Sequence, residues 1–345
     1  MKVVIIIFLI IVALVVIGTL YPVLVGRQAT QQIVGNSLYR SEDGGQTWEN
    51  IQSFPGGEIS KLAWGGENEE YILAGTEANG LYRGKIIGDV WDQYPLSLGE
   101  TSRVLDILEP AGIDNLIASV FYRNFGRIIE SRGTERRELL QTPLQSFAFF
   151  KGWISRDKRT IRVIGSDGGL YESNDGGSRW LTLARFSEGL ILLEVNEVNP
   201  AEIWVADGQG SIFKSTNGGR DWTDLTEGLR DFFGTEVPKV LFYETRSGVL
   251  YHGSNFGILK SQDKGATWKD LTITLPPEAL PVTAIASNPA SSSTLLVGAG
   301  NQVYLSEDRG LTWSARRIPV GGNISSFIVD SAGQIMFLGI HGTNR

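Results

Sequence analysis

Two patterns of hydrophobic and polar residues divide this chain. Near the N-terminus, Val3 to Val25 form a run of 23 uncharged residues between Lys2 and Arg27. A helix of that length rises about 34 Å, which is enough to cross the roughly 30 Å hydrocarbon core of a bilayer. In the rest of the chain, short apolar stretches alternate with Gly, Asn, Asp and Ser. That pattern is typical of short strands joined by tight turns.

The N-terminal run predicts a transmembrane anchor over residues 1–26, followed by a linker over 27–35. The alternative is a cleaved signal peptide, whose apolar region usually spans about 7–15 residues and precedes a site of the A-x-A kind. The run here is longer, and no clear site of that kind follows it. A short positive N-terminus before a first helix usually stays in the cytoplasm. We therefore expect a single-pass membrane protein whose remaining residues lie on the extracytoplasmic side, periplasmic or extracellular.

The strand pattern recurs in units of four. One unit contains runs rich in branched and aromatic residues, separated by Gly, Asn or Ser: Lys239–Tyr243, Val249–Gly253, Gly257–Lys260 and Thr267–Leu271. Four such runs in succession predict a four-stranded antiparallel meander. The 42 glycines among 345 residues agree with many tight turns.

An eight-residue signature marks these units. Five segments fit S-x-[DN]-x-G-x-x-W, and their defining residues are Asp43 and Trp48, Asp175 and Trp180, Asn217 and Trp222, Asp263 and Trp268, and Asp308 and Trp313. The last four tryptophans are 42, 46 and 45 residues apart, and the 132 residues from Trp48 to Trp180 equal three periods of 44. We therefore expect two degenerate copies, at Gly80–Gly84 with Trp91 and at Gly126–Ser131. Seven units of this length are typical of propeller blades.

The units do not start in register with the chain. One strand, Ser37–Arg40, precedes the first signature, whereas Ile324–Val329 and Gln334–Gly339 follow the last one. A blade made from both termini would close the ring and remove exposed sheet edges. The predicted fold is all-β: a single seven-bladed β-propeller over residues 36–345, built of four-stranded antiparallel blades. Its N- and C-terminal strands share one blade, and one transmembrane helix precedes it.

The signature resembles the Asp-box (BNR) repeat of sialidases, xyloglucan-hydrolysing propellers, sortilin-type receptors, and photosystem II stability/assembly factors with their bacterial relatives. The resemblance covers residues 36 to 340 and is greatest to the assembly-factor group, which has a single seven-bladed propeller. It implies a non-enzymatic protein that holds membrane-protein subunits during assembly. In such a box the Asp accepts hydrogen bonds from its own turn and the Trp packs beneath it. Calcium binding is a poor alternative because calcium needs six or more converging oxygens.

Composition removes several kinds of chemistry. The chain has no cysteine, which excludes disulfides, thiolate catalysis and Cys-ligated metal. Its net charge of −7 argues against a nucleic-acid partner. The two histidines, His252 and His341, are each expected in a turn after the second strand of a blade, and two histidines do not make a metal site alone. We expect no metal and no cofactor.

Glycan binding or sialidase-like glycoside hydrolysis is the alternative function that the resemblance raises. Arg317–Pro319 matches an Arg-Ile-Pro motif of sialidases, but it follows the last box, on an outer strand. Tyr243 and Glu244 suggest a nucleophile pair, yet adjacent strand residues point to opposite faces. Four carboxylates could still form a pair at a useful separation: Asp106, Glu109, Glu194 and Glu197. We expect no enzymatic activity and no catalytic residue.

The degenerate third blade contains the strongest candidate for a protein-binding site. Its arginines and nearby aromatic residues are Arg123, Arg127, Arg132, Arg136, Arg137, Phe121, Tyr122 and Phe125. Arginine and aromatic residues are enriched in interaction hot spots. The alternative is a solvated loop balanced by Glu130, Glu135 and Glu138. We predict a membrane-anchored, extracytoplasmic propeller that acts as a protein-binding scaffold or assembly factor for a membrane-protein complex.

Overall fold

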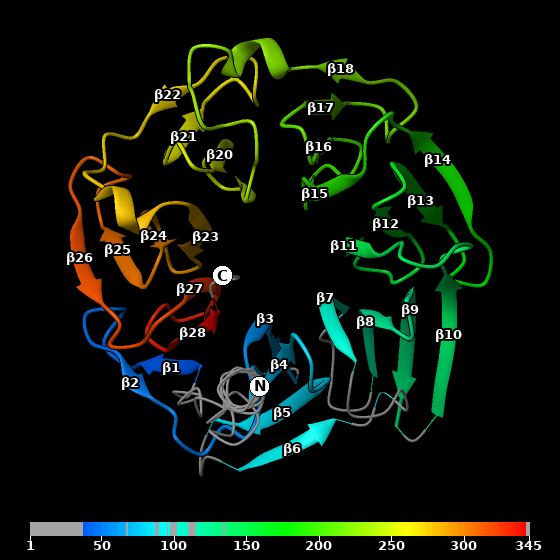
Figure 1. Ribbon diagram of the computed structural model, residues 1–345, viewed down its shortest axis with the longest axis horizontal. Helices are drawn as coiled ribbons and strands as arrows, with labels where there is room; N and C mark the ends of the chain where they lie inside the picture. The colour runs from blue at the N-terminus through cyan, green and yellow to red at the C-terminus, as the bar shows by residue number, and fades with distance from the viewer. Residues whose placement is uncertain are drawn as a thin grey trace, which may run out of the picture. The chain divides into compact units, whose positions relative to one another are not determined.

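The computed structural model describes residues 37–66, 68–86, 90–94, 96, 102–109, 115–133 and 135–342. These residues form seven four-stranded antiparallel sheets arranged around a central axis (Figure 1). This confirms the predicted seven-bladed propeller for this part of the chain. The chain divides into two compact units, residues 1–35 and 36–345. The predicted anchor (1–26) and linker (27–35) lie outside the described residues, in which no helix is long and apolar enough to span a membrane.

Each blade is a meander whose first strand faces the central channel and whose fourth lies at the rim (Figure 1). The second blade consists of β3 (Ile59–Gly65), β4 (Tyr71–Thr76), β5 (Leu81–Lys85) and β6 (Trp91–Tyr94). The third consists of β7 (Arg103–Glu109), β8 (Asn115–Tyr122), β9 (Phe125–Arg132) and β10 (Glu135–Gln141). The fourth consists of β11 (Phe149–Ile154), β12 (Ile161–Gly165), β13 (Gly169–Ser173) and β14 (Leu181–Arg185).

The next three blades repeat this order. The fifth consists of β15 (Leu190–Val195), β16 (Ile203–Asp207), β17 (Ile212–Ser215) and β18 (Thr223–Asp224). The sixth consists of β19 (Val240–Glu244), β20 (Val249–Gly253), β21 (Ile258–Ser261) and β22 (Lys269–Asp270). The seventh consists of β23 (Val282–Asn288), β24 (Ser291–Ala299), β25 (Gln302–Ser306) and β26 (Ser314–Arg317). Short 3-10 helices follow the fifth and sixth blades: η1 (Thr226–Leu229) and η2 (Pro277–Ala279).

The first blade joins the two ends of the chain, as predicted. It contains β1 (Leu38–Ser41), β2 (Glu49–Asn50), β27 (Asn323–Val329) and β28 (Met336–His341), in the spatial order β2-β1-β28-β27. Leu38 lies opposite Gly339 and Ser41 opposite Met336. These backbone hydrogen bonds close the ring, so the termini leave no open sheet edge between them.

The blades pack through apolar side chains on facing sheets, and glycines allow a close approach. A Cβ atom on Gly339 of β28 would lie 2.4 Å from Cγ2 of Ile59 on the neighbouring blade. Gly298 of β24 faces Ile324 in the same way, at 2.8 Å. Such distances are far below van der Waals contact. The glycine of one blade therefore leaves a space, and the branched side chain near the start of the next blade fills it.

The five box segments form the same turn, of which Asp43 is representative. Its Oδ1 accepts hydrogen bonds from Ser41 Oγ (2.8 Å) and the Thr47 backbone N–H (2.9 Å), and its Oδ2 accepts one from Thr47 Oγ1 (2.6 Å). Ser41 Oγ in turn accepts the N–H of Gly45 at 2.8 Å. The bonds from Thr47 lower the pKa of Asp43 to about 2, because they favour the charged carboxylate. The carboxylate is thus satisfied by its own turn.

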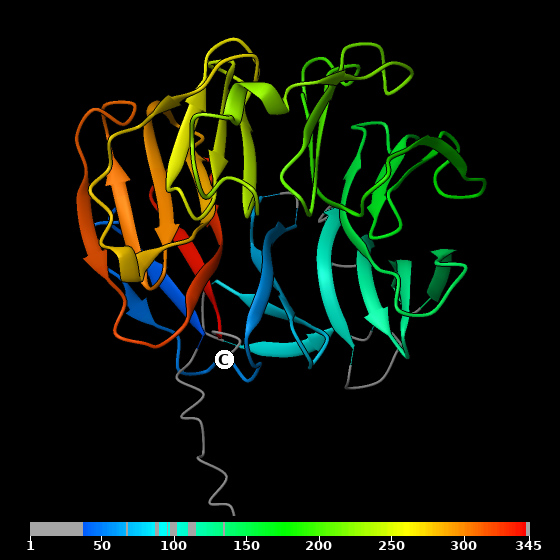
Figure 2. The same cartoon turned by 45° about the horizontal axis from the view of Figure 1, so that its top comes forward.

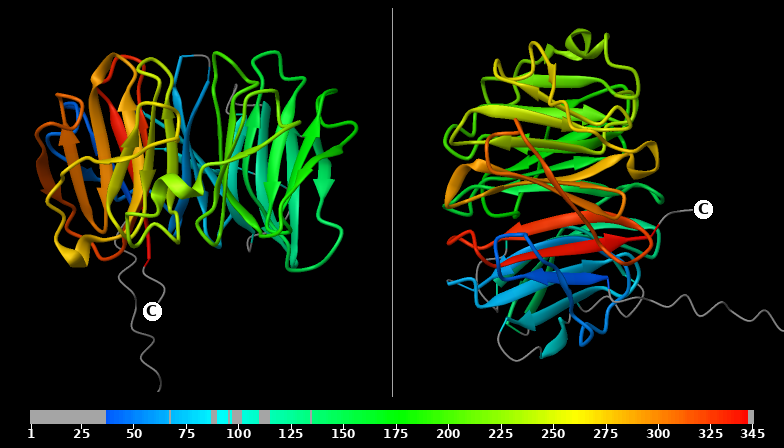
Figure 3. Two further views of the ribbon diagram at one scale, coloured as in Figure 1. Left: turned by 90° about the horizontal axis from the view of Figure 1, so that it is seen from above. Right: turned by 90° about the vertical axis from the view of Figure 1, so that its left-hand side faces the viewer.

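The direction of the strands gives the ring two distinct ends. Each box turn joins a third strand to a fourth, so all five lie at one end, here called the box end. The turns between second and third strands lie at the opposite end, where β1 also begins. Figures 2 and 3 show the strands running between these two ends. The chain therefore enters the ring at the end opposite the boxes.

Candidate functional site

The structure separates the predicted third-blade patch into two groups. Phe121, Tyr122, Arg123, Phe125 and Arg127 gather at the β8–β9 turn, at the end opposite the boxes. There the guanidinium of Arg123 lies 5.1 Å from the ring centre of Tyr122, and the guanidinium of Arg127 lies 5.6 Å from the ring centre of Phe125. Arg127, the member of this group nearest to the other three arginines in sequence, lies roughly 17 Å along β9 from Arg132, at 3.3 Å per residue.

The second group lies at the β9–β10 turn, at the box end. A surface hollow of about 500 Å³, here called the arginine hollow, is lined by Glu130, Arg132, Glu135, Arg136 and Arg137. Nε of Arg132 and Nε of Arg137 donate to the two oxygens of Glu130, at 2.8 and 2.9 Å. The side chains of Arg132 and Arg137 remain 64% and 49% exposed, whereas that of Glu130 is only 6% exposed. The hollow therefore presents mainly guanidinium groups to solvent.

Some of these arginines also hold the blade together. Arg127 donates to Glu138 at 2.9 Å and to the carbonyl of Tyr122. Arg137 donates to the carbonyl of Gly176, in the box turn of the next blade, at 3.0 Å. Glutamates thus balance part of the arginine charge, as in the alternative prediction. Of Arg132 and Arg137, Arg132 has the more exposed side chain.

The four carboxylates considered for hydrolysis have different surroundings. Asp106 is 3% exposed, receives the N–H of Gly152 at 3.0 Å and pairs with Nζ of Lys61 at 3.3 Å. Glu197 accepts the indole N–H of Trp153 at 2.9 Å, away from the channel. The side chain of Glu109 lies outside the described part of the structure. Of the three carboxylates whose side chains the structure describes, Glu194 is the one that lines the central channel.

The channel contains a cavity of about 570 Å³ lined by the first strands of all seven blades. Lys61 of β3, Lys151 of β11 and Glu194 of β15 face it, and Asp106 of β7 lies beside Lys61. Lys61, Asp106 and Lys151 follow one another at intervals of 45 residues and hold equivalent places in successive blades, whereas Glu194 lies two residues beyond the equivalent place, which Leu192 holds. Lys61 and Lys151 were missed in the sequence. The signal was there, because each is the third residue of an otherwise uncharged strand.

The enclosure of the channel shifts the proton affinity of these groups. Burial raises the pKa of Glu194 to about 7, although Lys151 and Lys61 partly oppose it. The ammonium of Lys61 is the main reason why the pKa of Lys151 is lowered. Burial disfavours ionisation of Asp106, but Lys61 and Lys151 together hold its pKa below the usual value. Protein surrounds these side chains, although the side chain of Lys61 remains 30% exposed.

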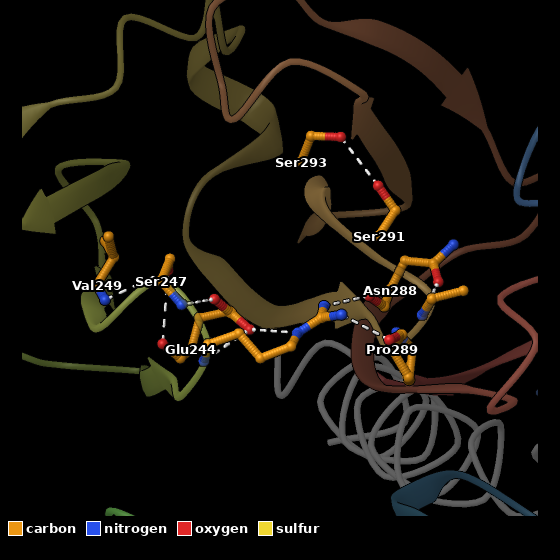
Figure 4. A network of polar contacts seen from close by, with 9 residues as sticks. Glu244, Ser247, Val249, Asn288, Pro289, Ser291 and Ser293 are labelled. Atoms are coloured by element: carbon orange, nitrogen blue, oxygen red, sulfur yellow. Dashed lines mark hydrogen bonds and ion pairs between the residues drawn. The ribbon is translucent and has the colours of Figure 1, made fainter.

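The residues that suggested a sialidase site lie at the rim or have structural roles. Arg317 ends β26, the outermost strand of the seventh blade, so the Arg317–Pro319 motif lies at the rim as expected. Tyr243 stacks on Trp204 with ring centres 4.7 Å apart. Glu244 points the other way, into the polar network of Figure 4, where it accepts the N–H of Ser247 at 2.6 Å. The two do not share a site.

That network joins the sixth blade to the seventh. Arg246 donates its Nε to Glu244 at 3.2 Å. Its two terminal nitrogens donate to the carbonyls of Asn288 and Pro289, each at 2.6 Å (Figure 4). Glu244 thus orients an arginine that bridges two blades, which is a structural role.

The prediction for His252 was wrong. His252 lies within β20, not in a turn, and is fully buried 5.8 Å from the ring of Trp268. Burial lowers its pKa to about 4, so it is neutral near pH 7. His341 ends β28, with Nδ1 3.5 Å from carboxylate oxygens of Glu58 and Glu77. No group of three or more His, Asp or Glu in the described residues could hold a metal ion.

Several solved structures share this fold at low sequence identity. A GH74 xyloglucanase from Xanthomonas campestris matches with a TM-score of 0.66 and 15% identity, over 86% of this chain and 52% of the enzyme. A GH74 enzyme from Niastella koreensis matches with a TM-score of 0.66 and 16% identity, over 83% of this chain and 52% of the enzyme. The chain therefore spans about half the length of these enzymes.

A smaller protein matches over nearly its whole length. YCF48 bound to a D1 peptide matches with a TM-score of 0.64 and 14% identity, over 88% of this chain and 97% of YCF48. No family model matches the chain, and no curated protein matches its sequence. What these similarities show is a propeller fold common to this chain, an assembly factor and glycoside hydrolases.

Proposed function

We propose that this chain is a non-enzymatic protein-binding scaffold, tethered to a membrane by its N-terminal segment, with the propeller on the extracytoplasmic side. The observation that carries the proposal is the arginine hollow. Among the described residues that line it, three arginines stand beside two glutamates, on a chain whose net charge is −7. A partner segment rich in Asp or Glu would pair with the exposed side chains of Arg132 and Arg137, because a guanidinium binds a carboxylate through two parallel hydrogen bonds.

Two further observations support a scaffold. The box carboxylates are occupied by their own turns, and Asp106 and Glu197 have partners within the protein. YCF48, which shares the fold over 97% of its length, has been solved with a D1 peptide bound. Glycan binding or hydrolysis is the second candidate, favoured by the likeness to GH74 enzymes and by the channel position of Glu194.

The test is peptide binding by the full-length protein in detergent. Fluorescence anisotropy would compare Asp/Glu-rich peptides with Lys-rich and neutral ones, for the wild type and for the double variant Arg132→Ser, Arg136→Ser. Arg137 is retained so that the buried Glu130 keeps a partner. We expect acidic peptides to bind the wild type and to bind the double variant at least tenfold more weakly. Binding to the wild type should also weaken as the salt concentration rises, because exposed ion pairs are screened.

The matched control is the double variant Arg179→Ser, Arg220→Ser. Both arginines are exposed in box turns of the fourth and fifth blades, at the same end of the ring. Equal losses in the two double variants, or no acidic peptide bound by the wild type, would overturn the role of the arginine hollow. Release of sugar from xyloglucan or sialosides by the wild type would instead establish the hydrolase candidate.

A further inference from the structure

The two lysines of the channel are unequally paired. Lys61 forms an ion pair with Asp106 at 3.3 Å, and Asp106 also receives the backbone N–H of Gly152. Within the part of the chain that the structure describes, Lys151 forms no ion pair. It lies close enough to Lys61 for that ammonium to be the largest influence on its own proton affinity. While Glu194 is protonated, Lys61, Lys151 and Asp106 together carry a formal charge of +1, which an ionised Glu194 would cancel.

The other side of the cavity combines apolar side chains with Lys239 and the hydroxyl groups of Thr283, Ser287, Ser325 and Ser326. Phe242 of β19, Ile285 of β23 and Phe327 of β27 line it, from the three blades that complete the ring (Figure 1). Between the two sides, the cavity encloses about 570 Å³, within the range of about 300–1,000 Å³ typical of small-molecule sites. Apolar side chains beside a small number of charged and polar groups are the usual composition of such sites.

We propose that the central cavity binds a small organic monocarboxylate, independently of the arginine hollow at the rim. The ligand carboxylate pairs with Lys151, and its apolar body lies against Phe242, Ile285 and Phe327. The excess positive charge selects an anion, and these three apolar side chains select one with a hydrocarbon or aromatic body over a bare inorganic ion. Glu194, when protonated, donates a hydrogen bond to the same carboxylate.

The dependence on Glu194 gives the site a pH response of known sign. The charged groups that influence Glu194 are Lys61, Asp106 and Lys151, and the backbone of Tyr243 also contributes a hydrogen bond. The cavity lining holds further charges, on Glu77, Arg103 and Lys239. An ionised Glu194 repels a bound carboxylate and cannot donate to it. Binding should therefore weaken as pH rises past 7, by at most about tenfold per pH unit for a single proton.

The test is isothermal titration of the full-length protein with phenylacetate and hexanoate at pH 6 and pH 8. Phenylacetamide, cyclohexylamine and inorganic phosphate are the comparison probes. We expect both carboxylates to bind at pH 6, at least tenfold tighter than the amide, the amine or phosphate, and more weakly at pH 8. In Glu194→Gln, binding should persist and lose most of its pH dependence, because an amide donates at either pH.

Lys151→Met should weaken binding of the carboxylates at least tenfold. Its matched control is Lys269→Met, which removes an exposed lysine from β22 at the rim and should leave binding unchanged. Thermal melting of both variants shows whether they are folded. No binding of either carboxylate by folded wild type, equal binding by folded Lys151→Met, or preferential binding of the amine would each overturn the proposal.

Discussion

The rim and the channel of this propeller use carboxylates in opposite ways. At the rim, Asp43 accepts three hydrogen bonds from residues of its own turn, and its pKa falls to about 2. In the channel, Glu194 is enclosed by several blades, and its pKa rises to about 7. The same chemical group is thus fixed as an anion by local bonds or brought close to neutrality by its enclosure. A carboxylate that its own turn satisfies is structural, whereas one that faces an enclosed cavity is available to a ligand.

The largest expected effect comes from a rim tryptophan. Trp268 is 6% exposed and packs in the core between the fifth and sixth blades. Trp268→Ala should lower the free energy of unfolding by about 3–5 kcal/mol, because it removes a large buried side chain and leaves a cavity. Urea unfolding followed by circular dichroism measures this loss.

The matching change in the channel is Lys151→Met. It removes a charge held near the like charge of Lys61, so the stability at pH 7 should stay the same or rise slightly. A comparable loss of stability in both variants would contradict the distinction between a structural rim and a channel that is available for binding.

A smaller effect is expected from Glu194→Gln, as a function of pH. The raised pKa means that the folded protein holds the proton between 4.5, the ordinary value, and about 7, while the unfolded chain has released it. Wild-type stability should therefore fall as pH rises through that window, by about 1–3 kcal/mol in total. The variant cannot ionise, so its stability should exceed that of wild type at pH 8 and not at pH 4. Identical pH profiles would show that the channel does not perturb Glu194.

The smallest effect belongs to a single box carboxylate. Asp43→Ala should lower stability at pH 7 by about 1 kcal/mol, because exposed bonds from Ser41 and Thr47 are lost to water. Asp43→Asn should cost less, since the natural Asn217 keeps the equivalent bonds from Ser215 and Asp221. Wild-type stability from this group is present above pH 3.8 and is lost as pH falls toward 2. A Tm of Asp43→Ala that decreases in parallel with that of wild type over this range would contradict the assignment.

The arginines of the third blade show where proximity in sequence misleads. Arg123 and Arg132 are nine residues apart. In a compact loop they could be neighbours, but an extended strand rises about 3.3 Å per residue. β9 therefore carries them to opposite ends of the ring. One predicted surface became two, and only the arginine hollow combines exposed guanidinium groups with a concave surface.

The number of blades, their strand order and the closure of the ring were predictable from the sequence. The reason is that the box is local: the side chains of Ser41, Asp43 and Thr47 bond within their own turn, so each copy shows its full pattern within eight residues. The periodicity of these copies then counts the blades, including the degenerate second and third.

The contents of the channel and the fit between blades became known from the folded ring. Lys61, Asp106 and Lys151 recur every 45 residues, but Lys61, Lys151 and Glu194 are each a single charge in their strand until the ring brings the blades together. The close approach of Gly339 to Ile59 likewise joins opposite ends of the sequence. Contacts of this kind join side chains that are far apart in the chain and meet only when the ring closes. For that reason no local sequence pattern predicts them.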